Sequence, residues 1–127
     1  MSSRSQGLLG ELEAARYLRS LGYDIVASNY RCRFGEIDIV ARDGETTVFV
    51  EVKTRSPEAK VLPREAVTLS KQNKLCQAAL HYQTHNTGCT VMRFDVIEVI
   101  TDGSFLDPAR INHIKHAFEA GDGHAFF

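Results

Sequence analysis

The stretch GEIDIVARDGETTVFVEVKTR, residues 35–55, decides the fold of this chain. Apolar and polar side chains alternate through both of its halves, which is the pattern of a β-strand. Between the halves, Asp43-Gly44 is one of the strongest short signals for a hairpin turn. We therefore expect two antiparallel strands, over residues 35–42 and 46–54.

Three charged side chains interrupt the apolar residues of this hairpin. Asp38 lies among isoleucines and a valine, and Glu51 and Lys53 alternate with valines. Burying a charge without a partner is costly, so these side chains need an ion pair, water or a metal ion. Which of these they have largely determines what the protein does.

A two-residue turn fixes which of these side chains share a face of the sheet. It places Glu36 opposite Glu51, and Asp38 one diagonal step from Glu51 on the same face. Diagonal neighbours are about 7–8 Å apart at the backbone, close enough for two carboxylates to approach one cation. A three-residue turn would reverse the parity and separate Asp38 from Glu51.

Two interpretations of these charges are open. Glu51 and Lys53 form either an exposed ion pair, worth about 0–1 kcal/mol, or part of a metal site. Opposed carboxylates repel unless a proton or a cation lies between them, and this favours the metal site. Oxygen ligands with open positions suit Mg²⁺ or Mn²⁺, which also bind substrate phosphates. A lysine beside such an ion could position or activate an attacking water.

The rest of the chain predicts two helices and further strands around this hairpin. From the N-terminus we expect a helix over about 6–21 ending at Gly22, a strand over 23–30, a mobile loop over 55–69, a helix from a cap at Ser70 to about Asn86, and a strand over 90–100. Residues 111–118 fit either a short strand or a short helix. Because both faces of the hairpin carry apolar groups, we expect a three-layer α/β/α sandwich with a mixed central sheet.

Length and composition indicate one domain over residues 1–127, with frayed ends at 1–6 and 120–127. At 43% hydrophobic and 24% charged residues, the chain reads as an ordinary globular protein, and no apolar run is long enough to span a membrane. Three widely spaced cysteines indicate reduced thiols. Together with acidic residues too early for a signal peptide, this predicts a cytoplasmic protein.

The distribution of charge says more than the net charge of −1. Residues 50–75 carry six basic and three acidic side chains, and they follow a predominantly acidic segment. Basic charge gathered near a polar site could hold a phosphate backbone. The alternative is a solvated loop and helix face, and charge alone favours that alternative.

The spacing Asp38, turn, Glu51-x-Lys53 resembles the signature of the PD-(D/E)XK nuclease superfamily, although Ile37 replaces the proline of that motif. The resemblance implies a restriction-endonuclease-like fold. It also implies that Asp38 and Glu51 bind Mg²⁺ or Mn²⁺, and that Lys53 assists the nucleophilic water.

A closer resemblance covers nearly the whole chain. Gly10-Glu11, Asn29-Tyr30-Arg31, GEIDIV, VFVEVKTR and RFDVI resemble the YraN family of uncharacterised bacterial proteins, which is similar to archaeal Holliday junction resolvases. This resemblance implies an endonuclease acting on DNA, with branched or damaged DNA as the expected substrate, and by analogy a homodimer. The alternative is a nucleic-acid-binding module or an adaptor of the same fold without hydrolysis.

The resemblance also assigns roles to residues outside the hairpin. Glu11 matches a first-helix glutamate that completes the metal site in the related resolvases; otherwise it is an acid favoured by the helix dipole. Glu36 is either an outer ligand or the ion-pair partner of a nearby arginine. Four basic side chains are candidate nucleic-acid contacts: Arg31, Arg55, Lys71 and Lys74.

Overall fold

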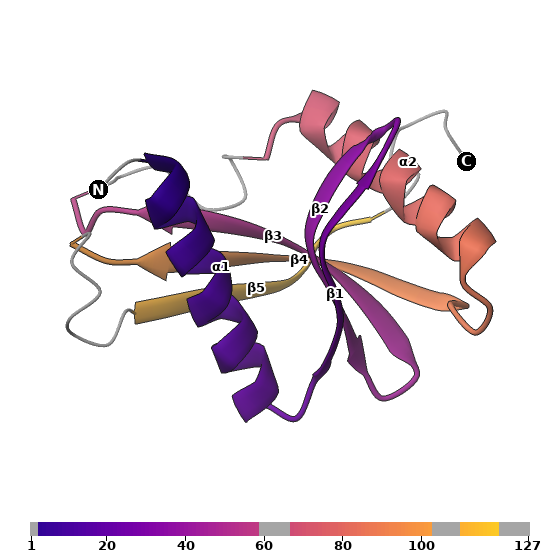
Figure 1. Cartoon of the computed structure of the whole chain (residues 1–127), viewed down its shortest axis with the longest axis horizontal. Helices are drawn as coiled ribbons and strands as arrows, with labels where there is room; N and C mark the ends of the chain where they lie inside the picture. The colour runs from indigo at the N-terminus through magenta and orange to yellow at the C-terminus, as the bar shows by residue number, and fades with distance from the viewer. Residues whose placement is uncertain (1–2, 59–66, 103–109, 120–127) are drawn as a thin grey trace.

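The computed structural model describes residues 3–58, 67–102 and 110–119, with side chains from Gly7 onward (Figure 1). Its elements are α1 (Ser3–Ser20), β1 (Asp24–Cys32), β2 (Gly35–Asp43), β3 (Thr46–Arg55), α2 (Leu69–His85), β4 (Val91–Ile100) and β5 (Arg110–Phe118). The strands form one sheet in the order β1-β2-β3-β4-β5. Three of the pairings are antiparallel, and β3 and β4 are parallel, so the sheet is mixed as predicted.

Helix α1 covers one face of the sheet. Its buried residues Ala14, Ala15 and Leu18 pack on a cluster that includes Ile39 and Val50. The helix ends as expected from Gly22, whose φ of +89° suits glycine. The Tyr23 N–H donates to the Leu18 carbonyl at 3.0 Å, which satisfies one of the last carbonyls of the helix.

Helix α2 covers the opposite face. Its apolar stripe meets Ile37, Val40 and Phe49 in a second buried cluster; the stripe consists of Leu75, Cys76, Ala78, Ala79 and Tyr82. The alternation of β3 explains the division, because Phe49 faces α2 whereas Val48 and Val50 face α1. The three-layer α/β/α sandwich with a mixed sheet is therefore confirmed.

The cap predicted for the second helix is wrong by two residues. Thr68 is the N-cap, in an extended conformation, and its hydroxyl accepts a hydrogen bond from the Lys71 N–H at 3.2 Å. A threonine in this position satisfies a free helical N–H as well as a serine does, so Ser70 lies inside the helix. The predicted end at Asn86 is confirmed, since Asn86 is the C-cap.

The ambiguous segment 111–118 is a strand, because β4 supplies an antiparallel partner for it along almost its whole length. The first helix begins at Ser3, earlier than the apolar pattern indicates. Most of the loop predicted over 55–69 and the terminal segment 120–127 lie outside the described residues. In the described part of the chain, no helix is long and apolar enough to cross a membrane.

Candidate functional site

The candidate site lies at a fork in the sheet between β2 and β3. The two strands pair from the turn only as far as Ile39 opposite Val50. Beyond that point β2 continues with β1 and β3 continues with β4. Figure 1 shows the β1–β2 hairpin reaching toward α2 while β3 runs on toward the start of α1. A fork of this kind leaves backbone groups unpaired and gives side chains access from both layers.

Asp38 lies at the fork and replaces part of the missing strand pairing. Its Oδ2 atom accepts a hydrogen bond from the Val52 N–H at 2.8 Å. The carboxylate therefore binds a β3 backbone group that no β2 carbonyl reaches, which fixes it near Glu51. This contact explains how an aspartate within an apolar strand is tolerated.

The predicted register of the hairpin is wrong by one residue on each strand. Asp43 pairs with Thr46, so the turn consists of Gly44 and Glu45, with Gly44 at a φ of +61°. A two-residue turn with glycine at its first central position and positive φ is a favoured hairpin geometry. Because both strands shift together, the parity is kept and the Asp38 and Glu51 side chains still share a face.

The same shift corrects the place of Glu36. It does not lie opposite Glu51; it pairs on the other side with Arg31 of β1, and the Glu36 Oε2 atom lies 3.4 Å from the Arg31 Nε atom. The Arg31 side chain is exposed and the Glu36 side chain is half-buried. Of the two roles considered for Glu36, the structure shows the ion pair with a nearby arginine.

Glu51 is the most buried acid of the candidate site, with 4% of its surface exposed. Two lysines approach the same oxygen: the Nζ atoms of Lys53 and Lys71 each lie 3.4 Å from Glu51 Oε1. The other oxygen, Oε2, is buried and has no hydrogen-bond partner among the residues that the structure describes. An unpartnered buried acceptor is costly, so this atom marks where a donor or a cation would be stabilising.

Glu11 reaches the same cleft from the opposite layer. Gly10 makes this approach feasible, because a Cβ at that position would overlap the Thr54 hydroxyl of β3. Burial raises the pKa of Glu11, against a hydrogen bond from the Asn29 side chain that lowers it. Its Oε1 atom is buried and, within the described residues, lacks a hydrogen-bond partner.

Asp38 is the acid of the site whose pKa is raised furthest. Burial raises the pKa of Asp38 to about 7, and the nearby carboxylates of Glu51 and Glu11 add to this increase. The hydrogen bond from the Val52 N–H and the charge of Lys71 act in the opposite direction. A half-buried aspartate whose pKa is near 7 and which faces other carboxylates is typical of a functional site, and it marks a place where positive charge is favoured.

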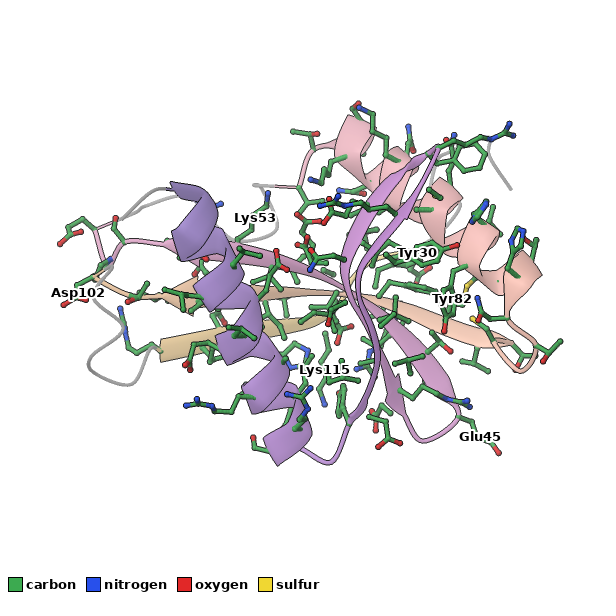
Figure 2. The ribbon with its side chains drawn as sticks, in the orientation of Figure 1. Tyr30, Glu45, Lys53, Tyr82, Asp102 and Lys115 are labelled. Carbon is green, nitrogen blue, oxygen red and sulfur yellow. The ribbon has the colours of Figure 1, made fainter. Side chains whose placement is uncertain are left out.

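These groups surround one open cleft. Its volume is about 330 Å³, and it is lined by Gly7, Glu11, Asp38, Glu51, Val52, Lys53 and Thr54. Figure 2 shows Lys53 extending from β3 into the region between α1 and the β1–β2 hairpin. The structure thus brings together the predicted residues Asp38, Glu51, Lys53 and Glu11, and it adds Lys71 from α2.

The donor set of this cleft fits a hard divalent cation, although it is not already arranged around one. Carboxylate oxygens are the ligands that Mg²⁺ and Mn²⁺ prefer, and two of those here are buried with no hydrogen-bond partner in the described part of the chain. Across residues 3–58, 67–102 and 110–119, however, no three acidic, histidine or cysteine side chains are close enough together to hold a metal ion. The two lysines on Glu51 supply the positive charge instead.

The remaining predicted basic residues differ in how accessible they are. Lys71 is in the site, and Lys74 is exposed on the next turn of α2, near Gly35. Arg31 is exposed beside Glu36. Arg55 is held against the buried Glu98 of β4, with 2.8 Å between Arg55 Nε and Glu98 Oε2, which turns it away from the cleft.

Sequence reasoning did not assign Asn29 to the site. It lies in β1 with a positive φ of 54°, a conformation that asparagine tolerates better than most residues, and its side chain hydrogen-bonds Glu11. The sequence signal was its place in Asn29-Tyr30-Arg31, one of the motifs shared with the resembling family. Strained backbone of this kind clusters at functional sites.

A second buried carboxylate, Asp95 of β4, has full partners. Its Oδ2 atom accepts from His113 Nε2 at 2.7 Å, and its Oδ1 atom accepts from Arg93 Nε at 2.8 Å and from the His116 N–H at 3.0 Å. Burial opposes ionisation of Asp95, but these hydrogen bonds outweigh it and lower the pKa. His113 also meets the Tyr17 hydroxyl, so this cluster braces α1 against β4 and β5.

Comparison with known proteins places the chain among a set of bacterial sequences. The sequence model of the uncharacterised protein family UPF0102 matches residues 10–99, which include the charged residues of the site, Glu11, Asp38, Glu51, Lys53 and Lys71. A "UPF0102 protein" of Syntrophus aciditrophicus is 49% identical over 120 residues, covering 92% of this chain and 91% of the relative.

Further relatives show the same extent of similarity. A "UPF0102 protein" of Lachnoclostridium phytofermentans is 44% identical over 122 residues, covering 94% of this chain and 98% of the relative. One of Caldicellulosiruptor saccharolyticus is 42% identical over 121 residues, covering 93% and 100%. The names of these relatives state a family and no activity, so the function has to be inferred from the site.

Proposed function

The chain belongs to the uncharacterised protein family UPF0102, also called YraN, and we propose that it is a metal-dependent endonuclease that hydrolyses phosphodiester bonds of DNA. One observation carries the proposal. In a single cleft, two buried carboxylate oxygens have no hydrogen-bond partner among the described residues, and the half-buried Asp38 has its pKa raised to about 7. Such a cluster is destabilised by its own charge, and the natural relief is a divalent cation.

We assign the roles of the site residues from their positions. Asp38 and Glu51 would hold Mg²⁺ or Mn²⁺, and Glu11 would be the third protein ligand. The bound ion would supply Lewis-acid polarisation of the phosphate and a lowered pKa for its bound water. Lys53 lies on the rim of the same cleft, where its ammonium can orient the water and offset charge that develops on the phosphate.

DNA is the proposed polymer because basic side chains flank the acidic cleft. Lys71 and Lys74 project from the first turns of α2, and Arg31 lies on the far side of the fork. Contacts of this kind hold phosphates without reading sequence. Branched or damaged DNA remains the proposed substrate by analogy with the resolvases, and so does a homodimer, since a four-way junction needs two symmetric cuts.

A second candidate is a nucleic-acid-binding module without hydrolysis. The observation that favours it is the pair of lysines on Glu51, which already neutralise the buried acid in place of a metal ion. In that case the protein would bind DNA in the presence of a chelator, with a steep dependence on salt, and would cut nothing.

The experiment that tests the proposal is cleavage of linear, flapped and four-way DNA with Mg²⁺, with Mn²⁺ and with a chelator. The variants are Asp38→Asn, Glu51→Gln and Lys53→Met, which keep the size of each buried side chain. We expect metal-dependent cleavage that all three variants lose. Binding by wild type without cleavage of any substrate, at any metal concentration, would leave only the second candidate.

A further inference from the structure

Helix α1 exposes apolar surface beside the candidate site. Leu8 and Leu12 are 50% and 65% exposed, although leucines of an amphipathic helix are normally buried. They are one helical turn apart and so lie on the same face of α1. With Ala15 and Ile39 they line a mainly apolar groove of about 290 Å³.

This groove adjoins the acidic cleft. Glu11 lines both of them, and it also lines a hollow of about 260 Å³ to which Asn29 and Arg31 contribute. Leu8 and Asn29 are shared between that hollow and the apolar groove. We call these three adjoining hollows the trough; its lining extends from Asp38 and Glu51, past Arg31, to the exposed leucines.

The apolar groove has a polar rim of a particular kind. Ser28 and the Asn29 amide offer hydrogen-bond donors and acceptors on the β1 side, and Arg19 adds a positive charge on the α1 side. A nucleobase combines flat apolar faces with a polar edge, and it is joined to a phosphate backbone. Enzymes that act on extruded bases hold them between apolar side chains and read their edge by hydrogen bonds.

We propose that the groove formed by Leu8, Leu12, Ala15 and Ile39 receives an unpaired base of the strand whose phosphate lies in the acidic cleft. This inference rests on the proposed function and narrows its substrate to nucleic acid with a single-stranded segment, such as a flap or a gap. A base inside a continuous duplex is stacked and paired, so it cannot enter a groove on the protein surface without being extruded.

Size and charge favour a base over a second protein chain as the occupant. A stable protein interface buries about 800 Å² on each partner, far more than two leucines and their neighbours offer. The trough also joins the apolar groove to Arg31 and to the basic start of α2, which complement a polyanion.

The test compares Leu12→Gln with Leu21→Gln as a matched control. Leu21 is 47% exposed near the end of α1 and does not line the groove. Affinities are measured by fluorescence anisotropy in a chelator for three DNA probes of equal length: a single strand, a flapped duplex and a blunt duplex. We expect Leu12→Gln to weaken binding of the first two roughly tenfold, with blunt-duplex binding unchanged and Leu21→Gln behaving as wild type.

Three outcomes would overturn the inference. In the first, Leu12→Gln would bind the single strand as tightly as the wild type, and in the second it would lose affinity equally for all three probes. In the third, light scattering would show that Leu12→Gln changes the oligomeric state, which would assign the groove to a second copy of the chain. The proposed function is judged separately, by metal-dependent cleavage of the wild type. If the wild type cleaves DNA and Leu12→Gln binds the single strand as the wild type does, the base-binding inference fails and the proposed function stands.

Discussion

Two aspartates of the same sheet, the half-buried Asp38 and the buried Asp95, have opposite environments. Asp95 accepts hydrogen bonds from His113, Arg93 and the His116 N–H, and its pKa is lowered. Asp38 accepts a hydrogen bond from Val52 and faces other carboxylates, and its pKa is raised to about 7. The chain thus satisfies the carboxylate of Asp95 with hydrogen-bond donors and leaves that of Asp38 beside other acids.

The contrast separates a structural acid from a functional one. Donors from β4 and β5 form hydrogen bonds with the Asp95 carboxylate. One of them, His113, also contacts the Tyr17 hydroxyl and so connects α1 to the sheet. At the fork, Asp38, Glu51 and Glu11 share a cleft whose positive charge comes from two lysines. Buried acids that lack hydrogen-bond donors are typical of sites where another positive group binds, and here we propose that this group is a cation.

The largest expected effect is on catalysis. Asp38→Asn and Glu51→Gln should each lower the rate of metal-dependent DNA cleavage at least a hundredfold, because a proposed ligand charge is removed from the site. Thermal melting should show that both variants remain folded, because each substitution keeps the size of the side chain and an oxygen that can accept a hydrogen bond. Retention of more than a tenth of the wild-type rate by Glu51→Gln would contradict the assignment.

The second effect is on stability, and it falls on the other aspartate. Asp95→Ala should lower the free energy of unfolding by about 3–5 kcal/mol, because it leaves Arg93 and His113 buried without their shared partner. Urea denaturation measures this. A loss below about 1 kcal/mol would mean that the cluster is no more than a surface ion pair and would weaken the contrast.

Much of this comparison could be predicted from the sequence, and the limits are physical. Apolar and polar residues alternate through β2 and β3, and a glycine lies at the turn between them. This pattern predicted the hairpin and placed Asp38 and Glu51 on one face. The register failed because the sequence does not show which residue of the turn takes the positive φ. An error of one residue on both strands preserves parity, so the predicted convergence of the two acids survived.

Contacts between layers could not be predicted in the same way. The approach of Lys71 to Glu51 depends on where α2 begins, and Thr68 rather than Ser70 caps it. Two of the three donors to Asp95, His113 and the His116 N–H, lie in a strand that the sequence left ambiguous. Local periodicity carries no information on which side chains meet across the sandwich.

The third prediction concerns pH, and its sign differs between the two aspartates. For Asp38 the folded pKa is above the unfolded value, so the native state binds the extra proton and stability falls as pH rises from about 4 to 7. The loss is at most about 4 kcal/mol for three pKa units. For Asp95 the folded pKa is lowered, so its stabilisation is present above about pH 4 and is lost as pH falls below that value.

Urea melts of the wild type and Asp38→Asn between pH 4.5 and 8.5, without metal, measure the difference. We expect the two proteins to be similar near the acidic limit and Asp38→Asn to be the more stable one at the alkaline limit. A wild type that gains stability relative to Asp38→Asn with rising pH would show that the carboxylate is already paired.

The smallest predicted effect is on the lysine that bridges the layers. Lys71→Met removes a positive charge 3.4 Å from Glu51, so Mn²⁺ should bind a few-fold more tightly at pH 8.5 while DNA binds more weakly. Lys74→Met, a turn away on the exposed face, should weaken DNA binding without changing the Mn²⁺ affinity. Equal Mn²⁺ affinity in wild type and Lys71→Met would show that the charge of Lys71 does not affect cation binding in the acidic cleft.

The central claim is that the acids of the fork bind a single divalent cation. Calorimetric titration of Mn²⁺ at pH 8 into the wild type, Asp38→Asn and Glu51→Gln tests it most directly. The account predicts one Mn²⁺ per wild-type chain and no measurable heat of binding in either variant. Binding of Mn²⁺ with unchanged stoichiometry and affinity in both variants, or its absence from the wild type, would contradict the account.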